Sequence, residues 1–183
     1  MPEVDLGWVE HLLAESDRGC VLIGQAILDE ALGDLLREYF TARSAASTDL
    51  LDSLLKSGEY APLGSFSPRA RMARALGIID EWTFKGLVQL NKTRIPFAHY
   101  KQPRAMRLSI EQSERILECV KRSDREVEGE RAKLLSDLVN EVQHHFGFTQ
   151  GTPRFNFVIA VAFLFAELRY RSTSSNHDTT LTA

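Results

Sequence analysis

The stretch TPRFNFVIAVAFLFAELRYR, residues 152–171, decides the fold. It opens with a threonine and a proline, a pair typical of a helix start because proline lacks only an N–H that would be unpaired there. The residues that follow are apolar on almost every side of a helix, and such a helix lies at the centre of a bundle or is covered by a partner. Asn156 and Glu167 interrupt the apolar run, which is too short to span a bilayer. We therefore expect a central helix from Arg154 to Arg171.

Helix signals continue outward from this stretch. Ser16 or Asp17 is placed to cap a long helix, in which apolar residues recur every three or four positions up to about Arg43. Ser109 and Gln112 form a capping-box pattern at the start of another helix. The boundaries predicted between these helices are an N-cap at Ser67 before Pro68, a C-terminal Gly77, an N-cap at Asp80 and an end near Ala98.

These signals predict an all-α fold, a single-domain bundle of roughly seven or eight helices over residues 1–171. The polar residues 172–183 are expected to form a disordered tail. The predicted helices cover about residues 6–13, 17–43, 48–56, 68–77, 80–98, 109–121, 134–146 and 154–171. The charged run 121–133 either continues the sixth helix or bends near Gly129.

The amino-acid composition is typical of a globular domain. The chain has 183 residues, of which 44% are hydrophobic and 26% charged, as in an average globular domain. Cys20 and Cys119 lie in apolar stretches without a CxxC spacing, so we expect buried free thiols, no metal site and no cofactor. Acidic residues interrupt the N-terminal region, which does not resemble a signal peptide. The sequence therefore predicts a cytoplasmic protein without a membrane segment.

Charge is distributed unevenly along the chain. Residues 65–107 contain nine Lys or Arg and two acidic residues, so this segment carries +7 and the rest of the chain −10, for a net charge of −3. Such a segment either binds an anionic partner or packs against acidic helices of the same chain. The candidate binding residues are Arg69, Arg71, Arg74, Lys92, Arg94, His99 and Lys101.

Arg94 and His99 form the most specific local pattern. Five residues apart, they lie about 140° apart around an ideal helix, but Pro96 predicts a kink or a helix end nearby. His99 could then turn towards Arg94, and an Arg that holds a phosphate beside a His that moves a proton would suffice for RNA cleavage without metal. Alternatively, His99 caps carbonyl groups at the helix end and Arg94 pairs with a carboxylate.

Acidic residues are the remaining candidates for functional or structural contacts. Asp29 and Glu30 lie beside the apolar face of the long helix, so one of them is expected to be partly buried and to need a cation, for which Arg94 and Arg71 are the candidates. Asp17 is interpreted as a helix cap. No helix-turn-helix is predicted, because the second helix of the only basic pair is apolar and belongs to the core.

Several segments, in order, resemble the mannitol operon repressor family over about residues 14–170. They are Ser16-Asp17-Arg18-Gly19, Leu28-Asp29-Glu30, Pro62-Leu63-Gly64-Ser65-Phe66-Ser67, Arg69, Ala75-Leu76-Gly77-Ile78-Ile79, Arg94, Phe97-Ala98-His99 and Pro153-Arg154-Phe155. The resemblance implies an all-helical regulator without a recognised DNA-binding motif. It also implies protein partners, including carriers of the sugar phosphotransferase system.

The pair Arg94 and His99 is also similar to the signature of the HEPN superfamily, which includes many ribonucleases. That signature often has a polar residue after the Arg, where this chain has Ile95-Pro96. Two functions are therefore predicted. The first is a non-enzymatic regulator, a candidate homodimer, that binds a protein partner; the second is a metal-independent ribonuclease or RNA-binding module. Direct DNA binding is a weaker third option, because the pI is near 6.0.

Overall fold

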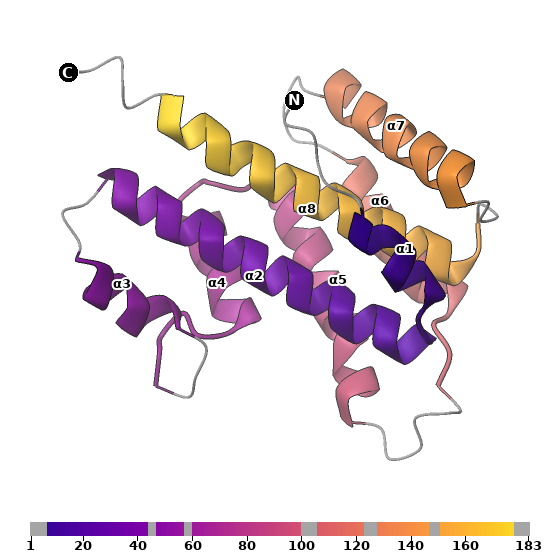
Figure 1. Ribbon diagram of the computed structural model, residues 1–183, viewed down its shortest axis with the longest axis horizontal. Helices are drawn as coiled ribbons and strands as arrows, with labels where there is room; N and C mark the ends of the chain where they lie inside the picture. The colour runs from indigo at the N-terminus through magenta and orange to yellow at the C-terminus, as the bar shows by residue number, and fades with distance from the viewer. Residues whose placement is uncertain are drawn as a thin grey trace.

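The computed structural model describes residues 7–43, 47–56, 60–99, 106–122, 128–146 and 151–177, and within these ranges every regular element is an α-helix. The predicted all-α bundle is confirmed (Figure 1). The helices are α1 (Gly7–Ala14), α2 (Asp17–Arg43), α3 (Thr48–Leu55), α4 (Phe66–Ala75), α5 (Glu81–His99), α6 (Ile110–Lys121), α7 (Glu128–Phe146) and α8 (Pro153–His177).

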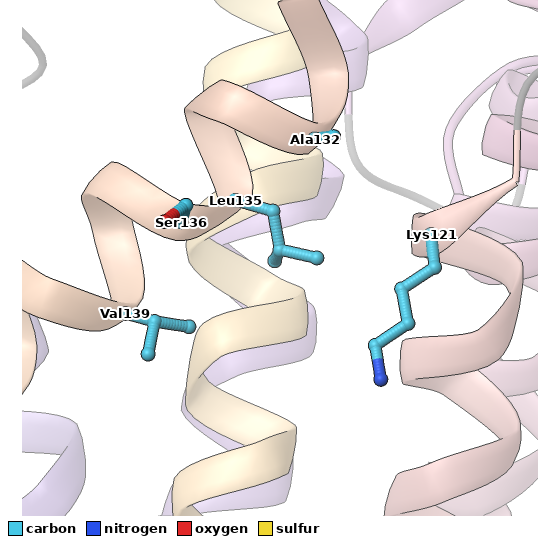
Figure 2. Close-up of a pocket in the computed structure, with 5 residues that line it drawn as sticks. All are labelled: Lys121, Ala132, Leu135, Ser136 and Val139. Atoms are coloured by element: carbon cyan, nitrogen blue, oxygen red, sulfur yellow. The ribbon is translucent and has the colours of Figure 1, made fainter. Parts of the chain in front are cut away.

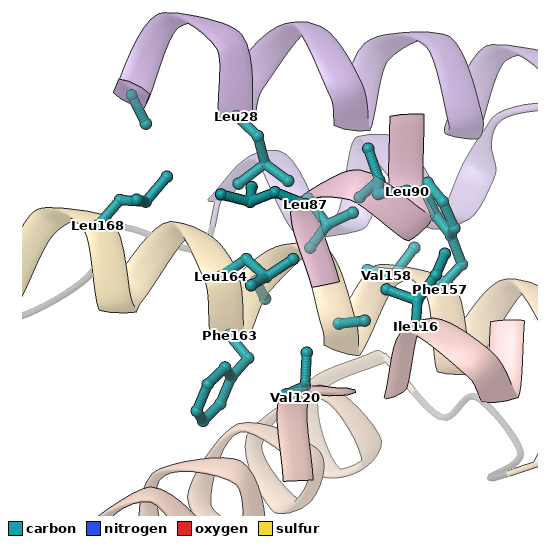
Figure 3. Close-up of a cluster of buried hydrophobic side chains, with 14 of the residues drawn as sticks. Leu28, Leu87, Leu90, Ile116, Val120, Phe157, Val158, Phe163, Leu164 and Leu168 are labelled. Atoms are coloured by element: carbon teal, nitrogen blue, oxygen red, sulfur yellow. The ribbon is translucent and has the colours of Figure 1, made fainter. Parts of the chain in front are cut away.

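Helix α8 is the central helix, as the apolar stretch predicts. Phe157, Phe163 and Leu164 have no exposed surface, and α8 packs against α1, α2, α5, α6 and α7. Figure 3 shows leucines of α2 and α5 on one side of α8 and Ile116 and Val120 of α6 on another. The neighbouring helices thus cover α8 on all sides, which is why its sequence needs no polar face.

Helices α2 and α8 lie side by side and run in the same direction (Figure 1). Two ion pairs fix their register, Asp17 with Arg154 near the starts of the helices and Asp34 with Arg169 further along. The helices also approach closely at Gly24, where a Cβ atom would lie 3.0 Å from the Phe157 ring. A small residue is therefore needed at this crossing, since the ring occupies the space of a side chain.

Most predicted helix ends agree with the structure. Ser109 and Gln112 form the predicted capping box, and Asp80 Oδ1 accepts a hydrogen bond from the Thr83 N–H at 2.7 Å. Gly77 has a φ of +70°, the left-handed conformation expected of a residue that ends a helix. At the start of the last helix, Thr152 Oγ1 accepts from the Phe155 N–H at 3.3 Å. Local capping chemistry therefore sets these boundaries.

Three predicted ends differ. Helix α4 begins at Phe66, so the predicted cap at Ser67 is wrong; Phe66 is buried and is held in the first turn by packing. Helix α7 begins at Glu128, six residues before its predicted start, and so includes part of the charged run. Helix α5, in contrast, ends at His99, close to the predicted Ala98, because a proline in the last turns removes only one backbone hydrogen bond. Helix α8 extends six residues beyond the predicted Arg171, into the expected tail. Residues 178–183 of that tail lie outside the described ranges.

Candidate functional site

Arg69, a predicted binding residue, lies inside the protein. Its side chain is only 6% exposed, and its Nε–H donates to the Leu63 carbonyl at 2.8 Å. One terminal nitrogen donates to the Asp29 carboxylate and to the Asp29 carbonyl, both at 2.9 Å, and the other donates to the Leu55 carbonyl. Arg69 therefore ties α4 to α2, to the end of α3 and to the segment before α4.

The partner of Asp29 was predicted to be Arg94 or Arg71, and this prediction is wrong. Arg69 takes that place, because Arg71 lies two residues further along α4, about 200° around the helix, and is exposed. Burial raises the pKa of Asp29, and the charge and hydrogen bonds of Arg69, with the more distant charge of Arg94, oppose this rise without cancelling it. Asp29 and Arg69 therefore form a largely buried ion pair that links α2 to α4, in which the carboxylate is partly removed from water. We call this pair, with the other hydrogen-bond partners of Arg69, the Arg69 tether.

Arg94 and His99 lie five residues apart on one continuous helix and face different sides of it. Arg94 is half-buried, and its Nε is enclosed without a hydrogen-bond partner among the described residues. His99 is exposed at the last residue of α5. Because α5 is continuous between them, the two side chains leave the helix about 140° apart. Neither lines any of the three pockets discussed below.

The other predicted binding residues divide into paired and unpaired cations. Arg74 Nε lies 3.0 Å from Glu81 Oε2, and this hydrogen bond, with the nearby charge of Lys85, holds the pKa of Glu81 below its usual value. Arg71 and Lys92 are exposed and form no ion pair among the described residues. The prediction for Lys101 falls outside the described ranges.

Trp82 is flanked by two cations from different helices. Lys85 Nζ lies 4.2 Å from the centre of the Trp82 ring, and Arg122 Cζ lies 5.0 Å from it. Arg122 has no carboxylate partner in the ranges the structure describes, whereas Lys85 lies 3.5 Å from Glu81. We call Trp82, Lys85 and Arg122 the Trp82 surface. Sequence reasoning missed it because Arg122 is outside the basic segment 65–107 and reaches Trp82 only through the packing of α5 on α6.

The Trp82 surface has the chemistry of an anion-binding surface. Guanidinium and ammonium groups bind carboxylates and phosphates through charge-assisted hydrogen bonds. The indole ring restricts both cations by cation–π contact. Aromatic side chains and Arg are also the residue types that contribute most to protein interfaces.

A polar pocket of about 420 Å³ lies between α2 and the end of α3, beside Arg69. Most of its charged groups are already paired within the chain: Asp29 with Arg69, Asp34 with Arg169 and Arg37 with Asp52. The acidic and basic groups balance one another, so the pocket offers no net charge of either sign to a ligand. We interpret it as the exposed edge of the Arg69 tether.

The interpretation of Asp17 as a helix cap is wrong. Ser16 caps α2, because its Oγ accepts from the Gly19 N–H at 3.1 Å. The Asp17 carboxylate instead pairs with Arg154 and accepts from the Leu108 N–H at 2.9 Å. Burial raises the pKa of Asp17, but the hydrogen bonds from Arg154 and Leu108, with the charges of Arg154 and Arg107, outweigh it and lower the pKa. Asp17 therefore joins α2 to α8 and to the segment before α6.

Replacing Asp17 with asparagine is expected to lower the free energy of unfolding by about 1.5–3 kcal/mol at pH 7. A carboxylate whose pKa is lowered on folding stabilises the fold above its unfolded pKa of 3.8 and loses this effect as pH falls through the folded value. The difference between wild type and variant should therefore be smaller at pH 3 than at pH 7. Urea denaturation at pH 3 and at pH 7 measures this difference in the free energy of unfolding. Asp52→Asn, which replaces an exposed carboxylate, is the control and should change the free energy of unfolding only slightly. An equal difference at both pH values would contradict the assignment.

The two cysteines are not reactive sites. Burial raises the pKa of Cys20 to about 12 and also raises the pKa of Cys119, so neither thiol is ionised near neutral pH. Among the described residues, no group of three His, Cys, Asp or Glu side chains is placed to hold a metal ion. None of the described helices has the length and apolar composition needed to cross a membrane.

We compared the chain with models of known protein families, with curated proteins and with solved structures, and it matches none of them.

Proposed function

We propose that this protein is a non-enzymatic regulator of the mannitol operon repressor type, acting in the cytoplasm through protein contacts to control sugar-utilisation genes. The observation that carries this proposal is the Trp82 surface, where Arg122 and Lys85 flank an indole ring. The separation of Arg94 from His99 on one continuous helix also favours binding over catalysis. Such a surface suits a partner with an acidic or phosphorylated face.

A carrier of the sugar phosphotransferase system fits this chemistry, because it carries a phosphoryl group and so presents an anion. The partner's anionic group would accept hydrogen bonds from the Arg122 guanidinium and the Lys85 ammonium groups, which Trp82 holds in place. The exposed Arg71 and Lys92 add positive charge that speeds the encounter without fixing its geometry.

Binding of purified phosphotransferase carriers, phosphorylated and unphosphorylated, tests the proposal by titration calorimetry. We expect Trp82→Ala and Arg122→Gln each to weaken binding by at least about tenfold, as for central interface residues. Lys133→Gln, which removes an exposed cation of α7, serves as the matched control and should bind as the wild type does. The proposal fails if no carrier binds or if all three variants bind equally.

A metal-independent ribonuclease or RNA-binding module is the second candidate, and the exposure of His99 and Lys92 on the basic helix α5 favours it. We expect no RNA cleavage above background when the protein is incubated with RNA and a chelator. His99→Ala should give the same result, because Arg94 and His99 leave α5 about 140° apart. Cleavage by the wild type that His99→Ala abolishes would overturn the non-enzymatic proposal; equal results for both proteins would remove the second candidate.

A further inference from the structure

A separate, largely apolar pocket lies between α6, α7 and α8. Its deep part has a volume of about 190 Å³ and is lined by Leu117, Val139 and Ile159, among others. An outer part of about 340 Å³ continues between α6 and α7, past Ala132. Figure 2 shows Leu135 of α7 extending into the same space from one side. The outer part reaches the lower end of the range of small-molecule sites, about 300–1,000 Å³, and the deep part lies below it.

Asn156 gives this apolar pocket an unsatisfied polar group. It is 7% exposed and lines the deep part. Its backbone N–H donates to the Thr152 carbonyl, but its side-chain amide has no hydrogen-bond partner among the residues the structure describes. The amide lines the pocket, so it can donate to and accept from a ligand group that enters there.

Lys121 supplies the one cation among the described residues that line either part. It lies at the end of α6, is exposed, and forms no ion pair within the described ranges. In Figure 2 its side chain extends from α6 into the space that Leu135 enters from α7. Since the described residues that line the two parts include no acidic side chain, the ammonium group favours an anion. One cation and one amide match a single carboxylate rather than a doubly charged phosphate.

We propose that this pocket binds a small amphipathic monocarboxylate. The carboxylate accepts hydrogen bonds from the Lys121 ammonium group and the Asn156 amide, which line the same deep part. The aliphatic chain lies along the apolar lining towards Leu135 and Val139, where its burial supplies most of the affinity. The proposal concerns a site apart from the Trp82 surface and does not rest on the proposed regulatory partner.

Titration of the full chain with octanoate and with octanol, followed by calorimetry, tests the proposal. We expect saturable binding of octanoate and at least about tenfold weaker binding of octanol, since octanol cannot pair with the ammonium group. Lys121→Met should weaken octanoate binding by about tenfold and leave octanol binding unchanged. Lys133→Met, an exposed cation of α7 outside the lining, should change neither. Asn156→Leu, similar in size, should also weaken octanoate binding.

Val139→Trp is a variant that fills the pocket and should abolish binding of both ligands, while thermal unfolding shows whether it remains folded. Equal affinities for octanoate and octanol would overturn the proposal. So would the absence of saturable octanoate binding at millimolar concentrations. It would also be overturned if Lys121→Met and Lys133→Met behaved alike, or if folded Val139→Trp bound octanoate as the wild type does.

Discussion

Replacing Arg69 with alanine is expected to lower the free energy of unfolding by about 3–5 kcal/mol. The substitution removes hydrogen bonds to the carbonyl groups of Leu63, Leu55 and Asp29, and it leaves the Asp29 carboxylate without its cation. Because Arg69 is buried, water cannot readily replace the lost donors. The loss should appear in the isolated protein, without any partner present.

Urea denaturation at neutral pH measures this effect, and Arg71→Ala is its matched control. Arg71 lies on the same helix and in the same basic segment, but it is exposed, so its removal should change the free energy of unfolding by less than about 0.5 kcal/mol. Arg69→Lys should recover only part of the loss, because an ammonium group cannot reproduce the planar fork of donors. Equal effects of Arg69→Ala and Arg71→Ala would contradict the assignment of Arg69 to the fold.

Phe157→Ala is expected to lower the free energy of unfolding by about 3–5 kcal/mol as well, because it opens a cavity at the centre of the bundle. Phe157 has no exposed surface and lies on the face of α8 that packs against α2. Thermal or urea unfolding measures the loss. Tyr60→Ala, which removes a ring that is 96% exposed, is the control and should have little effect.

A second substitution, Gly24→Ala, tests the packing at the crossing of α2 and α8. A Cβ atom at Gly24 would lie 3.0 Å from the Phe157 ring and 3.2 Å from Val161, so Gly24→Ala crowds the wild-type contact. Alanine also favours a helix over glycine by about 1 kcal/mol, and removal of the ring frees the space in which this preference can act. Gly24→Ala should therefore be more favourable in the Phe157→Ala background than in the wild type. Additive effects would show that the two residues do not interact.

Residues from the segments on which the family resemblance rests bind one another in the structure through hydrogen bonds and ion pairs. Asp29 and Leu63 both bind Arg69, and Asp17 binds Arg154, although these residues come from five separate segments. Much of that pattern therefore describes how the bundle is held together. The proposed functions depend instead on Trp82 and Arg122, and on the pocket beside Asn156, which lie outside the quoted segments.

The sequence by itself determined the helices and which of them is central. The apolar stretch that begins after Pro153 requires burial on every side, and Asp80, Gly77 and the Ser109 capping box set helix ends. These features depend on side chains within one or two turns of one another. Residues that are close in the sequence are here also close in space, so these features follow from the sequence directly.

Only the tertiary structure decided what each charged or polar side chain does. Arg69 and Arg71 are equivalent in the sequence, but packing of α4 on α2 places Arg69 against Asp29, 40 residues away, and leaves Arg71 in solvent. Packing likewise brings Arg154 to Asp17 across 137 residues, and places Arg122 over Trp82. The physical reason is that the free energy of a charge depends on its partner and its burial, and both are set by which helices meet.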